Sequence, residues 1–179
     1  MIIFIRHGQT KENLEGINTG RKDIPLNKTG KVQAKECAQI MMWDKFDVVY
    51  CSPLKRAKQT AKIIMKHHKH VPIIYDDRLV EREDGSATGM KQSEAYPKFV
   101  WDFKKKYDFE NFEQPAEMFK RVSGFYDEIL PKHKSQKVVI IAHDGVGKIS
   151  RMYFEGLPEC KNLDGFLFDN ARPYVLSED

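Results

Sequence analysis

Short apolar runs alternate along this chain with longer segments in which apolar residues recur every three or four positions. The clearest runs are Met1–Ile5 and Val138–Ala142, and a shorter one is Val48–Cys51. Runs of this length are typical of buried strands, whereas the periodic segments are typical of helices that bury one face. The alternation predicts an α/β fold with a mostly parallel sheet between two layers of helices, a three-layer α/β/α sandwich.

The helices expected between these strands carry start signals as well as apolar stripes. Asn27 is a residue type that caps helices, and Ser52–Pro53 is a second start signal. A further edge strand is expected at Val71–Tyr75, and a last strand lies within Gly165–Leu176, where Pro173 favours a sheet edge. The apolar stripes of the helices are Ala34, Cys37, Ala38 and Met41, then Leu54, Ala57, Ala61 and Ile64, and finally Ile149, Met152 and Tyr153.

The pattern changes between Gly85 and Lys137, where two amphipathic helices are expected and no strand. We interpret about residues 85–137 as a helical insertion that covers the carboxyl edge of the sheet, within a single domain over residues 1–179. A chain of this length can bury about 70% of the surface that it exposes when unfolded. The apolar faces of the two expected helices are Phe99, Phe103 and Tyr107 in the first, and Phe119, Val122, Tyr126 and Ile129 in the second.

The composition is that of an ordinary globular protein. The chain is 41% hydrophobic and 31% charged, has three cysteines, and contains no apolar run long enough to cross a membrane. The first apolar run is too short for a signal peptide and lacks a basic flank, so we expect a cytoplasmic protein with reduced thiols. The net charge of +4 favours anionic small molecules or phosphorylated protein surfaces. Lysine and glutamate are interleaved along the chain, so no nucleic-acid partner is expected.

Basic side chains follow three of the expected strands. Arg6 and His7 end the first, Arg56 follows the second, and His143 ends the apolar strand at residues 138–142. Because the carboxyl ends of parallel strands meet at one edge of the sheet, we expect these side chains to converge. Guanidinium groups match phosphate oxygens, and Gly8 allows the backbone to approach a ligand closely. The sequence therefore predicts a phosphate-binding pocket.

In these residues the chain resembles the histidine phosphatase superfamily, which includes the cofactor-dependent phosphoglycerate mutases. The matching segments run in the order of the family and span most of the chain. They are FIRHGQT at residues 4–10 with Asn13, DIPLNKTG at 23–30, CSPLKRAKQTA at 51–61, LVER at 79–82 and IAHDGV at 141–146.

The resemblance implies a role for each matching residue. His7 corresponds to the phosphorylated nucleophile, Glu81 to the proton donor, and Arg6, Arg56 and His143 to the phosphate pocket. The positions that line the pocket beside them are Asn13, Thr19 and Gly20. Two guanidinium groups near a histidine favour its neutral form and offset phosphoryl charge, so neither a metal nor another cofactor is expected.

The chain departs from the family pattern after the LVER segment. Asp84 stands where an aromatic residue often contacts substrate, and Thr88 where glutamate is usual. The insertion is also shorter than in the mutases, which leaves the pocket more open to water. We therefore expect a metal-independent phosphatase that acts on a small phosphorylated substrate or a phosphoprotein. The alternatives are a phosphoglycerate mutase and a non-catalytic phosphate-binding module. Substrate and oligomeric state stay open.

Three other motifs of the sequence fall short of known sites. Cys51 and Arg56 enclose four residues, whereas the loop of cysteine phosphatases encloses five. Gly147–Lys148 resembles the end of a P-loop, but Ile149 follows where Ser or Thr would hold Mg²⁺. His67, His68 and His70 fall at a helix end, where exposed cationic residues are common, so no metal site is expected there.

Overall fold

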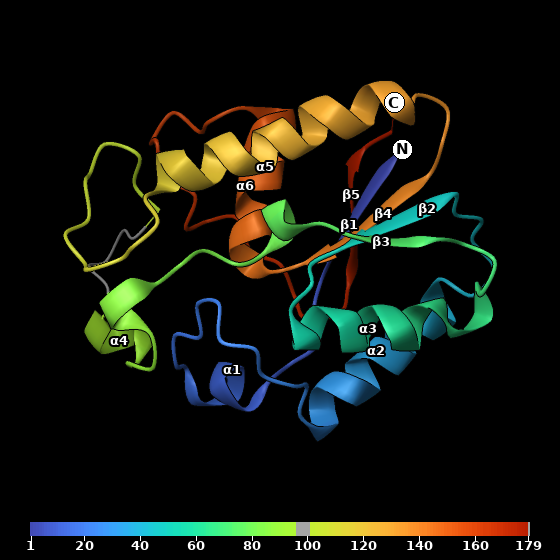
Figure 1. The fold of residues 1–179 in the computed structure, drawn as a ribbon, viewed down its shortest axis with the longest axis horizontal. Helices are drawn as coiled ribbons and strands as arrows, with labels where there is room; N and C mark the ends of the chain where they lie inside the picture. Colours follow the sequence, from blue (N-terminus) through green and yellow to red (C-terminus); the bar gives the residue numbers. More distant parts are fainter. Residues whose placement is uncertain (96–100, 179) are drawn as a thin grey trace.

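The computed structural model describes residues 1–95 and 101–178 and contains a five-stranded sheet (Figure 1). The strand order is β3-β2-β4-β1-β5, and only β5, at one edge, runs antiparallel to its neighbour. The predicted edge positions of the third and last strands are thus confirmed. The strands are β1 Ile2–Arg6, β2 Val48–Cys51, β3 Ile73–Tyr75, β4 Val138–Ala142 and β5 Pro173–Ser177.

The register of the central strands brings three loop starts together. Arg6 pairs with Ala142, and Cys51 pairs with Ile141, so β1, β4 and β2 end at the same level. The amide of His7 continues the ladder and donates to the Ala142 carbonyl at 2.9 Å. Residues that follow these strands therefore emerge side by side at the carboxyl edge.

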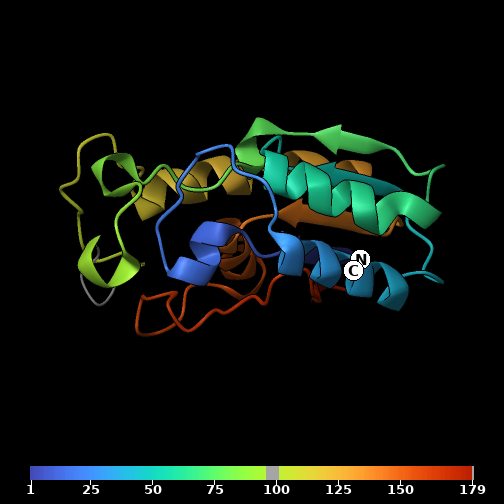
Figure 2. The same ribbon diagram turned by 90° about the horizontal axis from the view of Figure 1, so that it is seen from below.

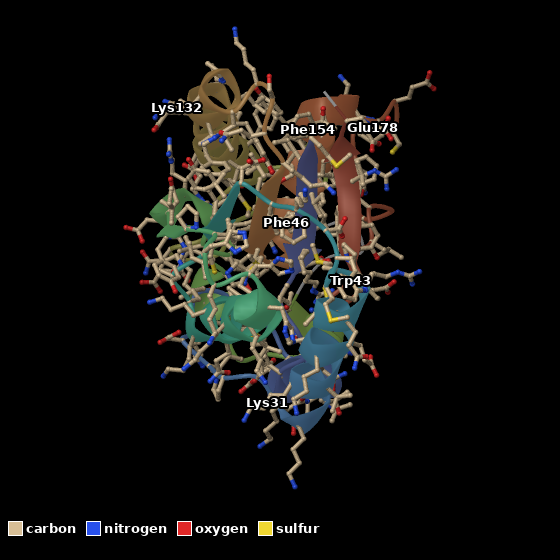
Figure 3. The ribbon with its side chains drawn as sticks, turned by 90° about the vertical axis from the view of Figure 1, so that its right-hand side faces the viewer. Lys31, Trp43, Phe46, Lys132, Phe154 and Glu178 are labelled. Atoms are coloured by element: carbon tan, nitrogen blue, oxygen red, sulfur yellow. The ribbon has the colours of Figure 1, made fainter. Side chains whose placement is uncertain are left out.

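Two helices cover one face of the sheet, α2 (Lys28–Ile40) and α3 (Lys55–Ile64), as Figures 2 and 3 show. The Asn27 side chain accepts a hydrogen bond from the Gly30 amide at 2.7 Å and so caps α2, as predicted. The residues buried on this face include Ile3, Ile5, Val139 and Ile141 from the strands, with Ala34, Cys37, Met41, Ala57, Ala61 and Ile64 from the helices.

The other face is covered by α5 (Pro115–Ile129) and α6 (Asp144–Glu155). Successive residues of a strand point to opposite faces, so Ile2, Phe4 and Ile140 lie on this side. Figure 3 shows the resulting order, with Lys132 and Phe154 on the helical layer above the sheet and Lys31 on the layer below. The predicted three-layer α/β/α arrangement is confirmed.

The insertion differs from its prediction. Its second helix is α5, which packs on a face of the sheet and forms a layer with α6. The first expected helix does not form over the described part, because Phe103 lies in a turn and Tyr107 in irregular backbone; Phe99 lies outside the described residues. The Gln114 side chain bonds both the amide and the carbonyl of Tyr107, and the Phe103 amide donates to the Lys161 carbonyl. Backbone groups held in this way cannot form an i→i−4 helical ladder.

Several short elements complete the chain. The helices α1 (Lys11–Glu15) and α4 (Gln92–Ala95) were not predicted, and α1 has a capping box between Thr10 and Asn13. Within the described ranges the longest helix has 15 residues, and none is both long and apolar enough to cross a membrane. The 3-10 turns are η1 Met65–His67, η2 Asp77–Leu79, η3 Gly85–Ala87 and η4 Leu130–Lys132.

Candidate active site

Two histidines and one arginine meet at the carboxyl edge of the sheet. Arg56 comes from the first turn of α3, and its Nε lies 3.2 Å from His7 Nε2 and 3.2 Å from His143 Nδ1. The two imidazole rings are 5.1 Å apart between centroids. A single N–H group therefore serves both histidines, and all three side chains are buried.

The hydrogen bonds fix which ring nitrogen of each histidine carries the proton. His7 Nδ1 lies 2.7 Å from the Gly8 carbonyl, which can only accept, so Nδ1 is the protonated nitrogen and Nε2 accepts from Arg56. In His143 the pattern is reversed, because Nδ1 accepts from Arg56 and Nε2 donates to the Ser52 hydroxyl at 2.7 Å. Both rings are neutral in this network.

Electrostatics favour the same neutral forms. Burial and the positive charges of Arg56 and Arg6 hold the pKa of His7 well below its usual value, although the bond to Gly8 opposes this shift. Burial and Arg56 lower the pKa of His143 in the same way. Near neutral pH His7 therefore keeps the Nε2 lone pair that a nucleophile needs.

Two backbone carbonyl groups hold the Arg56 guanidinium in place. Its Nη1 donates to the Lys22 carbonyl at 2.7 Å, and its Nη2 donates to the Gly20 carbonyl at 2.9 Å. Burial lowers the pKa of Arg56 to about 10, so the guanidinium is still charged at neutral pH. The loop around residue 20 thus fixes the charge that faces His7.

The backbone of the turn after His7 packs closely against the start of α2. The Gly8 amide donates to the Thr60 hydroxyl of α3 at 3.1 Å. A Cβ at Gly8 would overlap the carbonyl of Gly30, and a Cβ at Gly30 would overlap the backbone of Gln9. Glycine is therefore required at both positions for the His7 loop to contact both helices of this face.

Glu81 reaches the site from the segment after η2. Its Oε1 accepts from the Arg82 amide at 2.8 Å, and its Oε2 accepts from the Gly145 amide at 3.2 Å. Burial raises the pKa of Glu81, and the carboxylates of Asp144 and Asp84 raise it further, while the two amide bonds oppose the shift. A carboxyl group with a raised pKa can carry a proton near neutral pH and deliver it to a leaving group.

Seven of the eight predicted site residues line one cavity of about 570 Å³. His143 is the exception, because it is fully buried behind Arg56 and His7 and does not reach the cavity wall. Among the described residues, Arg6 Nε and the Thr19 hydroxyl have no hydrogen-bond partner. Both groups of the cavity wall can therefore form a hydrogen bond with a ligand. The seven residues are Arg6, His7, Asn13, Thr19, Gly20, Arg56 and Glu81.

The other predicted anchors of the pocket have their own contacts. Arg6 Nη1 donates to Asp144 at 3.2 Å and to the Phe168 carbonyl at 2.9 Å. The Asn13 side chain accepts from the Thr10 amide at 3.1 Å within the capping box of α1. Asn13 therefore stands at the cavity because a short helix, absent from the prediction, places it there.

The cavity wall also contains residues that the sequence pattern did not single out for the pocket. The Arg82 guanidinium stacks between the rings of Trp101 and Phe112, 4.2 and 4.7 Å from their centroids. Its Nε lies 3.3 Å from Asp84, which is 6% exposed. Asp84 was noted only as a departure from the family. Arg82 directly follows Glu81 in the LVER segment, which was the available signal, whereas nothing in the pattern marks Trp101.

The competing motifs do not form sites in the described part of the chain. Burial raises the pKa of the Cys51 thiol to about 12, which opposes thiolate chemistry. His68 is buried and its Nε2 lies 3.1 Å from the Met41 carbonyl. Residues 1–95 and 101–178 contain no group of three or more His, Cys, Asp or Glu side chains that could hold a metal ion.

Comparison with known proteins identifies the family. The family model of the histidine phosphatase superfamily, branch 1, matches residues 2–178. The chain belongs to this superfamily. It is a phosphatase of the histidine phosphatase type, as expected from its motifs.

Named relatives of this histidine phosphatase span most of its length. It is 35% identical over 148 residues to phosphoserine phosphatase 1 of Hydrogenobacter thermophilus, covering 79% of this chain and 70% of that one. It is 34% identical over 161 residues to a broad-specificity phosphatase of Saccharomyces cerevisiae, covering 87% and 69%. The structure of a phosphoserine phosphatase from Entamoeba histolytica superposes with a TM-score of 0.83 at 25% identity, covering 96% and 87%.

Proposed function

We propose that this phosphatase hydrolyses small phosphomonoesters without a metal ion, through a phosphohistidine formed on His7. One observation carries the proposal. The neutral ring of His7 is held with Nδ1 protonated, so that its Nε2 lone pair lies beside the Arg56 cation at the wall of the cavity. Nucleophile and phosphate-binding charge are therefore positioned together.

In the first step, His7 Nε2 attacks phosphorus while the bond from phosphorus to the leaving-group oxygen breaks. Glu81 transfers its carboxyl proton to that oxygen, so an alcohol leaves and Glu81 becomes a carboxylate. Arg56 and Arg6 offset the charge on the three remaining phosphoryl oxygens. The product of this step is phosphohistidine.

In the second step, water attacks the phosphorus of phosphohistidine. The Glu81 carboxylate takes a proton from the water, and the P–N bond breaks with its electron pair returning to Nε2. Phosphate is released, and both Glu81 and His7 are restored to their starting protonation states. His143 does not line the cavity, so we assign it the role of holding Arg56 through its Nδ1, with its own ring fixed by Ser52.

For the substrate, we propose small alkyl phosphates whose alcohol part carries both a positive and a negative charge. Phosphoserine is the first candidate. Relatives named as phosphoserine phosphatases support this choice. Asp164 at the cavity wall also supports this choice, because its buried Oδ2 has no hydrogen-bond partner among the described residues and is free to accept from the ammonium group of such a leaving group. The three free thiols support a reducing cytoplasm as the location.

The test is to trap the intermediate. Wild type quenched in alkali during turnover of labelled substrate should carry phosphate that mild acid releases, as a phosphoramidate does. His7→Ala should abolish both label and turnover with an unchanged thermal midpoint, whereas His70→Ala, at an exposed histidine, should match wild type. Acid-stable label on serine would overturn the mechanism. Stimulation by a bisphosphoglycerate primer would instead indicate a mutase, and loss of activity with EDTA would show a metal requirement.

A further inference from the structure

A row of lysines runs along α3 and continues beyond its end. The first three are three or four residues apart within α3 and so share one helix face. The last two follow in η1 and the next turn, and all five line the same cavity. All five are exposed. The row consists of Lys55, Lys58, Lys62, Lys66 and Lys69.

The row carries one sign of charge over five positions. Several other helix faces contain oppositely charged pairs four residues apart, as in Lys11–Glu15, Glu128–Lys132 and Arg151–Glu155, whereas α2 has a like-charge pair at this spacing only once, at Lys31 and Lys35. In the row, each lysine is followed by another, and like charges at this spacing destabilise a helix. Among the ion pairs of the described residues, only Lys55 has a partner, Asp23 at 3.6 Å. Four of the five lysines therefore have no ion-pair partner within the described part of the chain.

The lysines flank a second cavity of about 530 Å³, which lies away from the catalytic one. Its described lining contains these five lysines and no aspartate or glutamate. Between the lysines the floor is apolar, with Met65 and Val71 buried and Tyr75 52% exposed. Lys58 Nζ lies over the Tyr75 ring, 5.1 Å from its centroid. We call this feature the lysine groove.

One wall of the lysine groove is the free edge of the sheet. β3 is the outermost strand on this side and lies beside α3 (Figures 1 and 2). The Val49 amide donates to the Pro72 carbonyl, and the Asp76 amide donates to the Cys51 carbonyl. Because pairing alternates along a strand, the backbone groups of Ile73 and Tyr75 point away from β2, toward the outer edge. An uncovered edge of this kind can accept another strand.

We propose that the lysine groove binds an extended, acidic polypeptide segment that pairs with the outer edge of β3. Its backbone would bond Ile73 and Tyr75, and the side chains that it presents on the α3 side of the sheet would be carboxylates facing the lysines. Its alternate side chains would point to the opposite face of the sheet. Two features of the groove select this partner. The free edge of β3 requires an extended backbone to pair with, and the lysines require acidic side chains on that same segment. The proposal does not depend on the catalytic mechanism.

The probe for this proposal is a labelled, end-capped octapeptide of alternating glutamate and valine, measured by fluorescence anisotropy with the full-length protein. Saturable binding should weaken about tenfold or more in the double variant Lys62→Glu/Lys66→Glu. The matched control is Lys104→Glu/Lys106→Glu, which changes net charge equally at another exposed site and should bind within about twofold of wild type. Hydrolysis of p-nitrophenyl phosphate should be unchanged in both variants, which verifies that they are folded.

Two further comparisons test the strand pairing. A peptide N-methylated at alternate residues should lose binding, and hydrogen exchange at residues 71–76 should slow only with the unmodified peptide. Equal weakening by the two double variants, no saturable binding, or full binding of the methylated peptide would overturn the proposal. Tighter binding to phosphatidylserine vesicles or to single-stranded RNA, lost in Lys62→Glu/Lys66→Glu, would also overturn it and assign the groove to that partner.

Discussion

At the scale of single residues, Arg56 connects the parts of the site. Its one Nε–H reaches both histidines, while its two Nη atoms are tied to the loop that lines the cavity. The two backbone carbonyls hold the Nη atoms, so the guanidinium stays at the cavity when the Nε–H bond to His7 gives way and frees the Nε2 lone pair. The same charge lowers the pKa of His7, and in the proposed mechanism it also offsets the phosphoryl charge, so both effects depend on one side chain.

Arg56→Ala should therefore lower kcat/KM by about 10²–10³-fold, the usual loss for a preorganised donor to transition-state charge. Lys55→Ala removes the neighbouring cation, which forms an exposed ion pair with Asp23, and should cost less than about threefold. Steady-state kinetics on one alkyl phosphate would compare the two. Because Arg56 also holds the loop at residue 20, Arg56→Lys and thermal midpoints would separate lost chemistry from lost folding. Equal, small effects of Arg56→Ala and Lys55→Ala would show that the phosphate-binding residue is misassigned.

Glu81→Gln should separate substrates by their leaving groups. An alkoxide needs a proton as it leaves, so the rate on alkyl phosphates should fall by about 10²–10⁴-fold. Nitrophenolate leaves without one, so p-nitrophenyl phosphate should lose less than about tenfold. Single-turnover bursts would distinguish phosphorylation of His7 from its hydrolysis. If the burst with an alkyl phosphate is as fast in the variant as in wild type, another group is the acid.

The pH profile follows from the same two groups. In the proposed mechanism Glu81 holds a proton in the first step, and its pKa is raised. The kcat/KM for an alkyl phosphate should therefore fall as pH rises through that pKa. His7 must be neutral, and its pKa is lowered, so the acidic loss should come only well below the usual range for histidine. In Glu81→Gln the basic limb should disappear, and its persistence would assign that limb to another group.

At the scale of elements, the first turn of α6 fixes the position of Glu81. The Gly145 amide bonds the Glu81 carboxyl, and a Cβ at this glycine would overlap Oε1 and lie 2.8 Å from the Trp101 ring. The start of α6 thus fixes the Glu81 carboxyl, because the two groups are in contact and no space is left between them. His143 precedes the same helix, so one strand-to-helix junction positions groups on both sides of the site.

Gly145→Ala should displace Glu81 and lower kcat on alkyl phosphates by about tenfold or more, while p-nitrophenyl phosphate is affected less. Gly124→Ala is the matched control, because it lies within α5 and its Cβ would meet nothing within 4 Å. That control should keep full activity and gain about 0.5–1 kcal/mol of stability, the usual difference between alanine and glycine in a helix. Unchanged kinetics in Gly145→Ala would mean that Glu81 tolerates displacement.

Replacing a lysine of the row by an acidic residue should stabilise α3. Lys62→Glu places a carboxylate four residues from both Lys58 and Lys66, turning two repulsive pairs into attractive ones of about 0.2–0.5 kcal/mol each. The thermal midpoint should rise at low salt, and the rise should shrink at high salt as the charges are screened. Lys62→Gln should fall between wild type and Lys62→Glu. A lower midpoint in Lys62→Glu would show that the row has compensating contacts.

At the scale of the whole molecule, the sheet explains why much of the site was predictable. Arg6, His7 and His143 follow two apolar strands that turn out to be neighbours, so the pattern alone places them together. Glu81 is different, because it stands in a charged stretch where an exposed carboxylate would look the same. Only the resemblance to the family pointed to it, and its burial depends on α6 and Trp101, which pack against it from distant parts of the chain.

The remaining features depend on contacts that no local pattern contains. Phe103 and Tyr107 have helical spacing, yet Gln114 and Lys161 hold their segment in a non-helical conformation. The lysines of α3 look interleaved with other residues along the chain and form a row only when wound into a helix. The fully buried position of His143 likewise follows from Arg56 and Ser52, whose side chains close over it.

The two tryptophans of the chain stand at opposite ends of the strands. Trp101 is 6% exposed and lines the catalytic cavity, whereas Trp43 is 86% exposed and lies between α2 and the amino end of β2 (Figure 3). Trp43→Phe would therefore leave one indole in the described fold, placed against Arg82 and next to Glu81. Its emission should report occupancy of the cavity by unlabelled phosphates, so the protein supplies its own optical probe for substrates that release no coloured product.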